Sequence, residues 1–460
     1  MVEAVKWYRL AANQGLALAQ NTLGECHESG TGVEKDESEA VSWYHKAAEQ
    51  GLPEAQYNLG KCYMNGAGVY KSEFEACKWY SKAAEQGHAE AQYYLAICYR
   101  DGSGVAKNTV KAAYLFRKTA EQGLALAQNS LGECYENGTG VEKDESEAVS
   151  WYLKAAEHGL PEAQCNLGDC YLNGIGVEKN VSEAVSWYRK AAEQGLAAAQ
   201  NALGLCYVFG IGMEKDESEA VNWYRRAAEQ GLEEAQFNLG QCFANGTGVE
   251  KNATEAVKWY HKAAEQGDDM AQLMLGSYYY DGEGVEKDAS KAVKWYRLAA
   301  EQGLAMAQAA LGQCYEDGTG VEKSISEAVD WYEKAAEQGH AIAQYKIGMY
   351  YYSHKGEWKW KYDEAAKWFV KAAEKELAAA QYALGMCYAL GRGVSRDDGK
   401  AVQWFQKAAE QGLADAQFIL GSCYKDGTGV PKSWNEAKKW LRKAADQGHE
   451  EALKLLREGQ

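Results

Sequence analysis

A tryptophan returns every 36 residues along most of this chain, and that spacing constrains the fold more than any other feature of the sequence. The series is Trp7, Trp43, Trp79, Trp151, Trp187, Trp223, Trp259, Trp295 and Trp331. A period of about 20 to 50 residues is typical of proteins whose units each form one small element that cannot bury its apolar face alone. We therefore predict one array of stacked units over residues 1–460, with no separate globular domain.

One unit, residues 17–51, has the pattern of two helices joined by a glycine-containing turn. The first helix is predicted from apolar residues at helical spacing, namely Ala19, Leu23, Cys26 and His27. Gly30 is expected to end this helix in the left-handed conformation. Asp36 is expected to cap the second helix, whose apolar stripe includes Trp43. The unit is therefore a helical hairpin.

Twelve cysteines suggest a disulfide framework at first, but their spacing argues against one. Ten of them occupy the same position of their units: Cys26, Cys62, Cys98, Cys134, Cys170, Cys206, Cys242, Cys314, Cys387 and Cys423. Residues one unit apart lie about 10 Å or more from each other, whereas a disulfide needs Cα atoms within about 7 Å. Cys77 and Cys165 lie elsewhere and have no identifiable partner. We predict free, buried thiols, which favours a reducing compartment such as the cytoplasm.

The net charge of -17 and the pI of about 5.1 limit the classes of partner that this chain is expected to bind. An acidic surface repels phosphate backbones and anionic headgroups, so neither nucleic acid nor a membrane is expected as a partner. No run of about 18 apolar residues could span a bilayer, and the opening MVEAVKWYRL lacks the features of a secretory signal. We expect a soluble monomer. The chain opens within the second half of a unit, so a longer parent protein and a removed signal peptide are open alternatives.

The residues that usually carry chemistry are scattered along this sequence. The eight histidines are scattered along the chain, so no zinc site and no Ser-His-Asp or Cys-His arrangement is predicted. Gly-x-Gly recurs in eleven of twelve units, followed by valine in ten of them, which marks a turn rather than a phosphate-binding loop. We predict no catalytic residue, cofactor or metal, and no enzymatic activity.

Two consecutive motifs carry a family resemblance. The pattern A-Q-x-x-L-G-x-C-Y-x-x-G-x-G-V, followed by E-A-V-x-W-Y-x-K-A-A-E-Q-G, resembles the Sel1-like repeat, a relative of tetratricopeptide arrays. Ala-Gln pairs delimit twelve complete repeats over residues 15–448, with a lone second helix in 1–14 and a partial first helix in 449–460. The resemblance implies an all-α fold, an α/α superhelical solenoid that commonly serves as a scaffold or adaptor for protein partners.

Function is then expected where residues vary on this fixed framework. The sites equivalent to residues 21, 25 and 28 share one face of the first helix. Apolar residues at the first two sites are our candidates for binding a peptide or partner protein on the concave side: Tyr57, Tyr93, Ile97, Leu205, Phe237, Tyr345, Met349, Tyr382, Met386 and Phe418. The alternative is that the aromatic side chains pack between hairpins, in which case they would be buried.

Two units depart from the consensus. Leu115 and Phe116 replace the usual Trp-Tyr pair, a swap that is expected to pack acceptably. The loop 353–365 lacks Gly-x-Gly-Val and carries Trp358 and Trp360 among lysines, which is a second candidate recognition element. The alternative for this loop is that its tryptophans cover apolar surface left by the missing valine.

Two other functions are possible. The array could be the repeat region of a larger signalling or host-interaction (effector) protein. Cysteine-rich Sel1-like relatives are described as β-lactamases or penicillin-binding proteins, and the resemblance places their paired cysteines eight residues apart across the turn between hairpins. Here those places hold Ala48 and Gln56, and likewise Ala156 and Gln164, so the paired cysteines are absent.

Overall fold

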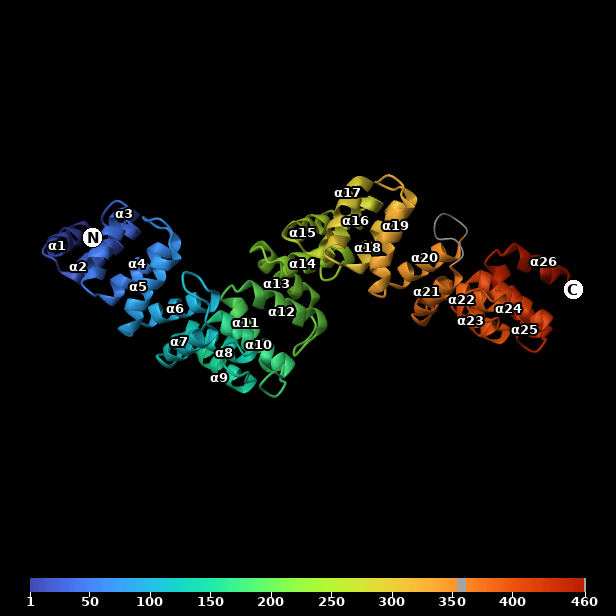
Figure 1. Cartoon of the computed structure of the whole chain (residues 1–460), viewed down its shortest axis with the longest axis horizontal. Helices are drawn as coiled ribbons and strands as arrows, with labels where there is room; N and C mark the ends of the chain where they lie inside the picture. The colour runs from blue at the N-terminus through green and yellow to red at the C-terminus, as the bar shows by residue number, and fades with distance from the viewer. Residues whose placement is uncertain (354–360, 459–460) are drawn as a thin grey trace. The chain divides into compact units, whose positions relative to one another are not determined.

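The computed structural model describes residues 1–353 and 361–458, and within these ranges every regular element is an α-helix (Figure 1). The helices are α1 (Val2–Asn13), α2 (Ala17–Ser29), α3 (Glu37–Glu49), α4 (Pro53–Asn65), α5 (Glu73–Glu85), α6 (Ala89–Asp101), α7 (Thr109–Glu121), α8 (Ala125–Asn137), α9 (Glu145–Glu157), α10 (Pro161–Asn173), α11 (Val181–Glu193), α12 (Ala197–Phe209), α13 (Glu217–Glu229), α14 (Glu233–Asn245), α15 (Ala253–Gln266), α16 (Asp269–Asp281), α17 (Ala289–Glu301), α18 (Ala305–Asp317), α19 (Ile325–Glu337), α20 (Ala341–Tyr352), α21 (Tyr362–Glu374), α22 (Ala378–Leu390), α23 (Asp398–Glu410), α24 (Ala414–Asp426), α25 (Trp434–Asp446) and α26 (Glu450–Glu458). The predicted all-α fold is confirmed.

These helices alternate between two kinds, which we name helix A and helix B. Each repeat consists of an even-numbered helix A followed by an odd-numbered helix B, and α1 and α26 are an isolated helix B and helix A. We number the repeats 1 to 12 by the first residue of helix A: 17, 53, 89, 125, 161, 197, 233, 269, 305, 341, 378 and 414.

The chain divides into two compact units, each built by the same rule. Unit 1 is Met1–Leu232 and holds α1 to α13; unit 2 is Glu233–Gln460 and holds α14 to α26. In each unit, helix A packs on helix B of its own repeat, as α2 does on α3, and helix B packs on helix A of the next, as α3 does on α4. The predicted stacking of helical hairpins is therefore confirmed.

The helix ends form as the sequence predicts. Gly30 ends α2 in the left-handed conformation, with φ of 72°, and its N–H donates to the carbonyl of Cys26. The side chain of Asp36 accepts hydrogen bonds from the backbone N–H groups of Ser38 and Glu39, at 3.0 and 2.9 Å, at the start of α3. Because these signals are local, each repeat sets its own hairpin.

The two helices of a repeat approach most closely at a glycine and a tyrosine. Tyr44 of α3 is fully buried, and a Cβ atom on Gly24 of α2 would lie only 2.7 Å from its ring. A side chain at Gly24 would crowd this ring, which explains a glycine in the middle of a helix, and repeat 3 is the exception, with a buried Ala96. In repeat 3 the replacement Phe116 is fully buried and Leu115 is half-buried, so this pair packs as expected.

All twelve cysteines are free, and all but the half-buried Cys423 are buried, as predicted. Cys77, for which spacing suggests no partner, has one in the structure. Its thiol donates to the carbonyl oxygen of Ser103, at 3.0 Å, and Cys77 lies in the same buried cluster as Cys98. Ser103 lies in the turn that follows α6, so this bond joins repeats 2 and 3.

Glutamine side chains tie each repeat to the one before it. Gln20 Nε2 donates to the carbonyl of Ala12 in the preceding helix B, at 3.1 Å. Gln50, at the end of helix B in the same repeat, donates to Gln20 Oε1 at 2.7 Å. Three helices therefore meet at one buried amide, and nearly the same arrangement recurs at Gln56 and Gln86.

Candidate binding surface

The six predicted aromatic residues on helices A are half-buried, neither enclosed between repeats nor fully exposed. Five of them pack against the buried aromatic ring of helix B in the same repeat. The ring centroids are separated by 6.1 Å for Tyr57–Tyr80, 5.7 Å for Tyr93–Phe116, 5.7 Å for Phe237–Tyr260, 6.0 Å for Tyr345–Phe369 and 5.7 Å for Tyr382–Phe405. The sixth, Phe418, stacks on His449 at 4.5 Å. One side of each ring therefore contacts the core while part of it stays accessible.

In unit 1 the structure brings two of these aromatics together. The ring of Tyr94 lies 5.9 Å from Tyr57 of the preceding helix A and 5.4 Å from Tyr93 of its own. Ile97, four residues after Tyr93, is half-buried. Leu205 of α12 is also half-buried, three repeats further along. Tyr57, Tyr93 and Ile97 thus form a local group from which Leu205 is separate.

In unit 2 three aromatics occupy consecutive repeats at the end of the array. Tyr345, Tyr382 and Phe418 stand at equivalent positions of α20, α22 and α24. Met349 is 38% exposed and Met386 is half-buried, each four residues after a tyrosine. Phe237 of α14 lies three repeats earlier. The other two candidates, Trp358 and Trp360, fall outside the described residues.

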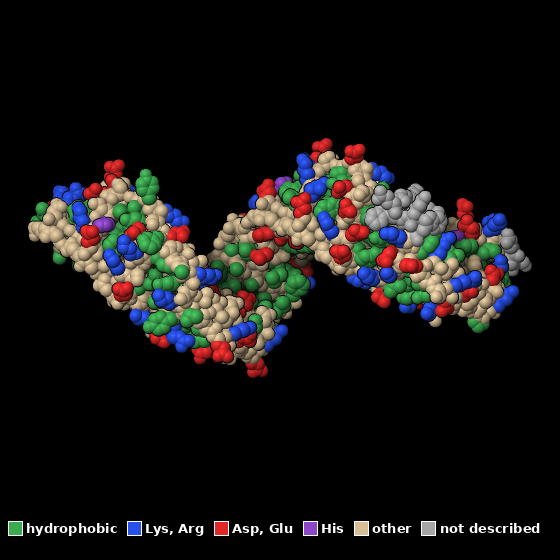
Figure 2. Space-filling model, in the orientation of Figure 1, with side chains coloured by type: hydrophobic (Ala, Val, Ile, Leu, Met, Phe, Trp, Pro, Cys, Tyr) green, Lys and Arg blue, Asp and Glu red, His purple; other side chains and the backbone are tan. Residues whose placement is uncertain are grey.

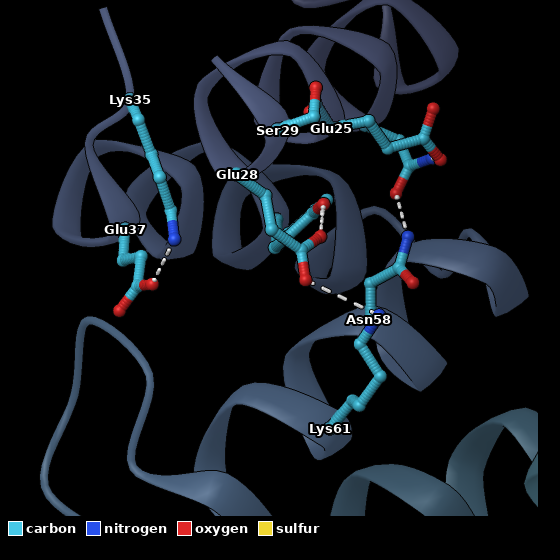
Figure 3. A network of polar contacts seen from close by, with 9 residues as sticks. Glu25, Glu28, Ser29, Lys35, Glu37, Asn58 and Lys61 are labelled. Atoms are coloured by element: carbon cyan, nitrogen blue, oxygen red, sulfur yellow. Dashed lines mark hydrogen bonds and ion pairs between the residues drawn. The ribbon is translucent and has the colours of Figure 1, made fainter.

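Other repeats carry polar side chains at the same sites. Asn21 Nδ2 donates to Glu25 Oε1 at 2.8 Å, and Asn58 of the next helix A donates to Asn21 Oδ1 at 3.1 Å. Figure 3 shows Glu25 and Asn58 in this network, on neighbouring helices. Repeats 4 and 5 reproduce it with Asn129, Glu133 and Asn166. The same framework thus presents either aromatic or amide groups along helices A.

In the repeats with polar residues at these sites, the surface also includes a carboxylate, Glu28 in repeat 1, which the sequence did not predict as a site residue. The hydroxyl of Tyr44 donates to Glu28 Oε2 at 2.6 Å, and Glu28 also forms an ion pair with Lys61 of the next repeat at 3.3 Å (Figure 3). Burial and the bond to Glu28 raise the pKa of Tyr44 far above its usual value, so the phenol stays a donor. Equivalent tyrosine–glutamate bonds are Tyr152–Glu136 at 2.6 Å and Tyr332–Glu316 at 2.8 Å.

A sequence signal for these carboxylates does exist. Glutamate stands at this position only in the repeats whose first variable site is Asn21, Asn129 or Ala309. Small residues there leave room for the carboxylate to reach the tyrosine hydroxyl. A large aromatic residue at that site instead packs on the ring of helix B, as Tyr57 does on Tyr80 and Phe237 does on Tyr260.

Neither a metal site nor a membrane helix is found in the ranges that the structure describes. No group of three or more His, Cys, Asp or Glu side chains there could hold a metal ion. No helix in that part of the chain is long and apolar enough to cross a bilayer.

The positions at which the resemblance implies paired cysteines have a different role in this chain. Gln56 Nε2 donates to the carbonyl oxygen of Ala48 at 3.2 Å, and Gln164 makes the same bond to Ala156. Buried hydrogen bonds therefore join neighbouring hairpins at these positions.

A two-helix hairpin with fixed glycines, stacked on its neighbours and varied on one face of helix A, defines a Sel1 repeat solenoid. The Sel1 repeat model matches residues 1–16, 17–52, 53–88, 89–124, 125–160, 161–196, 197–232, 233–268, 269–304, 305–340, 341–377, 378–413 and 414–449. The chain belongs to the Sel1 repeat family. Proteins built from such repeats are generally protein–protein interaction scaffolds and are typically non-enzymatic.

Two solved structures are similar over most of their length. One is a protective antigen present in uropathogenic Escherichia coli strains, which displays an SLR fold. It is 37% identical, the match covers 90% of each chain, and the TM-score is 0.77. The other is a Sel1 repeat protein from Oxalobacter formigenes, 35% identical over 67% of this chain and 90% of that one, with a TM-score of 0.54. Among curated proteins, no sequence matches this chain.

Proposed function

We propose that this protein is a non-enzymatic scaffold that binds a partner protein or peptide along the concave side formed by helices A. The observation that carries the proposal is the contrast between two sets of residues on the same helices. Gln20 and Gly24, and their equivalents, hold the hairpins together and change little. The site equivalent to Asn21 changes from a buried asparagine to a half-buried tyrosine or phenylalanine.

The aromatic rings at this site are suited to act as anchors. Tyr345 is held against Phe369 at a centroid distance of 6.0 Å, and Tyr382 against Phe405 at 5.7 Å. A ring that is already held in place loses little conformational entropy when a partner covers its free side. Tyrosine is also enriched among residues that dominate interface energies.

The group in unit 2 is the stronger candidate for the main contact. Tyr345, Tyr382 and Phe418 lie in three consecutive repeats, and Met349 and Met386 adjoin them on the same helix faces. An extended peptide or a helix that crosses successive helices A would meet an aromatic residue at each repeat. Methionine adapts its shape to irregular apolar partners.

The test uses a variant that carries, on α20 and α22, the asparagine–glutamate pair already present in repeats 1 and 4. Tyr345→Asn with Met349→Glu, and Tyr382→Asn with Met386→Glu, recreate the bonded Asn21–Glu25 pair on α20 and α22. Partners captured by the tagged intact chain are identified by mass spectrometry, then purified and titrated by calorimetry. The dissociation constant of a true partner rises by about tenfold or more in this variant.

A matched control replaces exposed apolar residues on helices B of unit 2. Leu298 and Ile325 are 44% and 40% exposed, and Leu298→Lys with Ile325→Glu introduces residues that other repeats carry there. This control binds as the intact chain does. Equal binding by the α20 and α22 variant would contradict the proposed surface.

A second candidate is that the partner is a host protein, as expected for a host-interaction protein. It is supported by the description of the 37% identical Escherichia coli structure as a protective antigen. Parallel captures from bacterial and mammalian lysates separate the two cases. Partners that come only from bacterial lysate, and that lose affinity in the variant above, would contradict the host version.

A further inference from the structure

A second exposed apolar surface lies on helices B of repeats 2 and 3 and on the turn that precedes α5, away from the variable face of helices A. Four side chains form it: Tyr70, Phe74, Val110 and Tyr114, which are 96%, 65%, 66% and 65% exposed. We name this group the B-face patch. All four residues belong to unit 1.

The patch departs from a pattern that the rest of the chain keeps. Phe74 and Val110 are each the second residue of a helix B. In the other repeats this residue is polar or glycine: Ser38, Ser146, Ser182, Ser218, Thr254, Ser290, Ser326, Asp363, Gly399 and Asn435. No packing in the hairpin requires an apolar group there, since serine serves in most repeats. The hydrophobic side chains of repeats 2 and 3 are therefore not explained by the fold.

The four residues lie on adjoining elements. Leu115 of α7 packs against the buried cluster that includes Tyr80 of α5, so the two helices B are neighbours. The turn of repeat 3 also touches the start of α5, because a Cβ on Gly104 would lie 2.7 Å from the backbone nitrogen of Phe74. Val110 and Tyr114 are four residues apart on α7 and share one face. Phe74 and Val110 thus stand at equivalent places on adjacent helices.

The part of the patch in repeat 3 is basic in an acidic protein, whereas in repeat 2 Glu73 and Glu75 flank Phe74. From Gly102 to Ala120 the chain carries Lys107, Lys111, Arg117 and Lys118 and no aspartate or glutamate. Figure 2 shows apolar and basic side chains beside one another over α6 and α7. An anionic group that approaches this face therefore meets a local positive charge.

Two of these lysines have lost the partners that their counterparts have. Lys35 and Lys143 pair with the first glutamate of helix B, at 2.9 and 2.8 Å, but Thr109 takes the glutamate's place after Lys107. Lys46, at the position equivalent to Lys118, lies 3.8 Å from the ring centroid of Trp43, but repeat 3 has Leu115 instead of tryptophan. In the described ranges, Lys107 and Lys118 form no ion pair, although the charge of Lys107 helps to lower the pKa of Asp101.

We propose that the B-face patch is a docking surface for an acidic amphipathic segment of a partner protein. Apolar side chains of the segment cover Phe74, Val110 and Tyr114, and its carboxylates pair with Lys107 and Lys118. The four apolar side chains supply buried area, and the excess of basic side chains in repeat 3 selects acidic over basic segments. This surface is independent of the binding site on helices A.

The experiment titrates two fluorescent peptides into the intact chain and follows their anisotropy. Both are short helix-forming peptides with leucine and tryptophan on one face, and the other face carries glutamate in one and lysine in the other. The glutamate peptide binds saturably, and added salt weakens its binding. Absence of saturable binding, or equal binding of the lysine peptide, would overturn the proposal.

The variant Phe74→Ser, Val110→Ser and Tyr114→Ser removes the patch with a residue that many repeats carry at these positions. It binds the glutamate peptide about tenfold more weakly or worse, while the Leu298→Lys, Ile325→Glu control does not. The α20 and α22 variant also keeps its affinity, which separates this surface from the one on helices A. If the triple variant binds as tightly as the intact chain, the B-face patch is not the site.

A second experiment, with lipid vesicles, tests whether the B-face patch binds an anionic membrane instead of a protein segment. Vesicles of phosphatidylcholine, with and without phosphatidylserine, are sedimented with the intact chain and with the triple variant. The proposal predicts no patch-dependent sedimentation. Sedimentation that requires phosphatidylserine and disappears in the triple variant would show that the patch binds anionic lipid. That result would overturn the proposal that it binds a protein segment.

Discussion

Gln344 Oε1 is buried without a hydrogen-bond partner, because Lys375 stands where other repeats place a glutamine. In repeat 1 the equivalent Gln50 donates to Gln20 at 2.7 Å. Lys375 donates instead to the carbonyl oxygen of Gly339. Repeat 10 therefore lacks one bond of the glutamine network that joins neighbouring hairpins.

Lys375→Gln is expected to restore this bond and to raise the free energy of unfolding by about 1 kcal/mol, since an unpaired buried acceptor is costly. The reverse change, Gln411→Lys, removes the equivalent bond to Gln381, which is 2.8 Å long, and should cost a similar amount. Urea unfolding followed by circular dichroism measures both. A Lys375→Gln protein no more stable than the parent would show that Gln344 gains nothing from the bond.

Glu376, the next residue, is the one non-glycine residue with a positive φ in the described ranges, at 61°. Other repeats place a glycine here, such as Gly412. Glu376→Gly should stabilise the chain by about 1 kcal/mol, because the left-handed conformation is strained for residues with a Cβ atom. Gly412→Glu, whose Cβ would meet no neighbouring atom, should be destabilising. Opposite signs in the same urea assay support the explanation, and equal signs refute it.

The contact between Glu316 and Lys346 should make stability depend on pH. Burial alone would raise the pKa of Glu316, but the hydrogen bonds from Lys346 and Tyr332, each 2.8 Å long, outweigh it and lower the pKa. A lowered folded-state pKa means that the carboxylate stabilises the fold above its unfolded value of about 4.5, and that this contribution is lost as pH falls through the folded value.

Glu316→Gln should therefore destabilise the protein by about 0.5 to 1 kcal/mol at neutral pH. The deficit should shrink below about pH 4.5 and vanish once Glu316 is protonated in the folded parent protein. Unfolding curves at a series of pH values measure the difference. A deficit that does not change with pH would mean that the charge of Glu316 is not what stabilises the contact.

Much of the fold follows from local signals in the sequence. Gly30 and Asp36 mark the ends of helices by themselves, and the spacing from Ala19 to His27 identifies a helix face without knowledge of its neighbours. Each signal recurs along the array, so a misreading in one repeat is corrected by the others. The hairpins and their stacking could therefore be predicted.

The binding surface could be predicted only in part, because its properties depend on contacts between repeats. The helix face of Tyr57 is visible from spacing, but its half-buried state results from the ring of Tyr80 beneath it. The hydrogen bond from the Cys77 thiol to the carbonyl oxygen of Ser103 joins residues of different repeats. The exposure of Phe74 is equally hidden, because the periodic pattern does not report which departures from consensus reach the surface.

The most direct test of the account is the removal of one complete repeat from unit 1. Deleting residues 161–196 takes out α10 and α11 and joins Leu160 to Ala197 in the same register as every other repeat boundary. If each hairpin sets its own structure and bonds only to its neighbours, the shortened chain stays folded, with a helical circular dichroism signal reduced in proportion to the residues lost. A disordered or aggregated product would contradict the account.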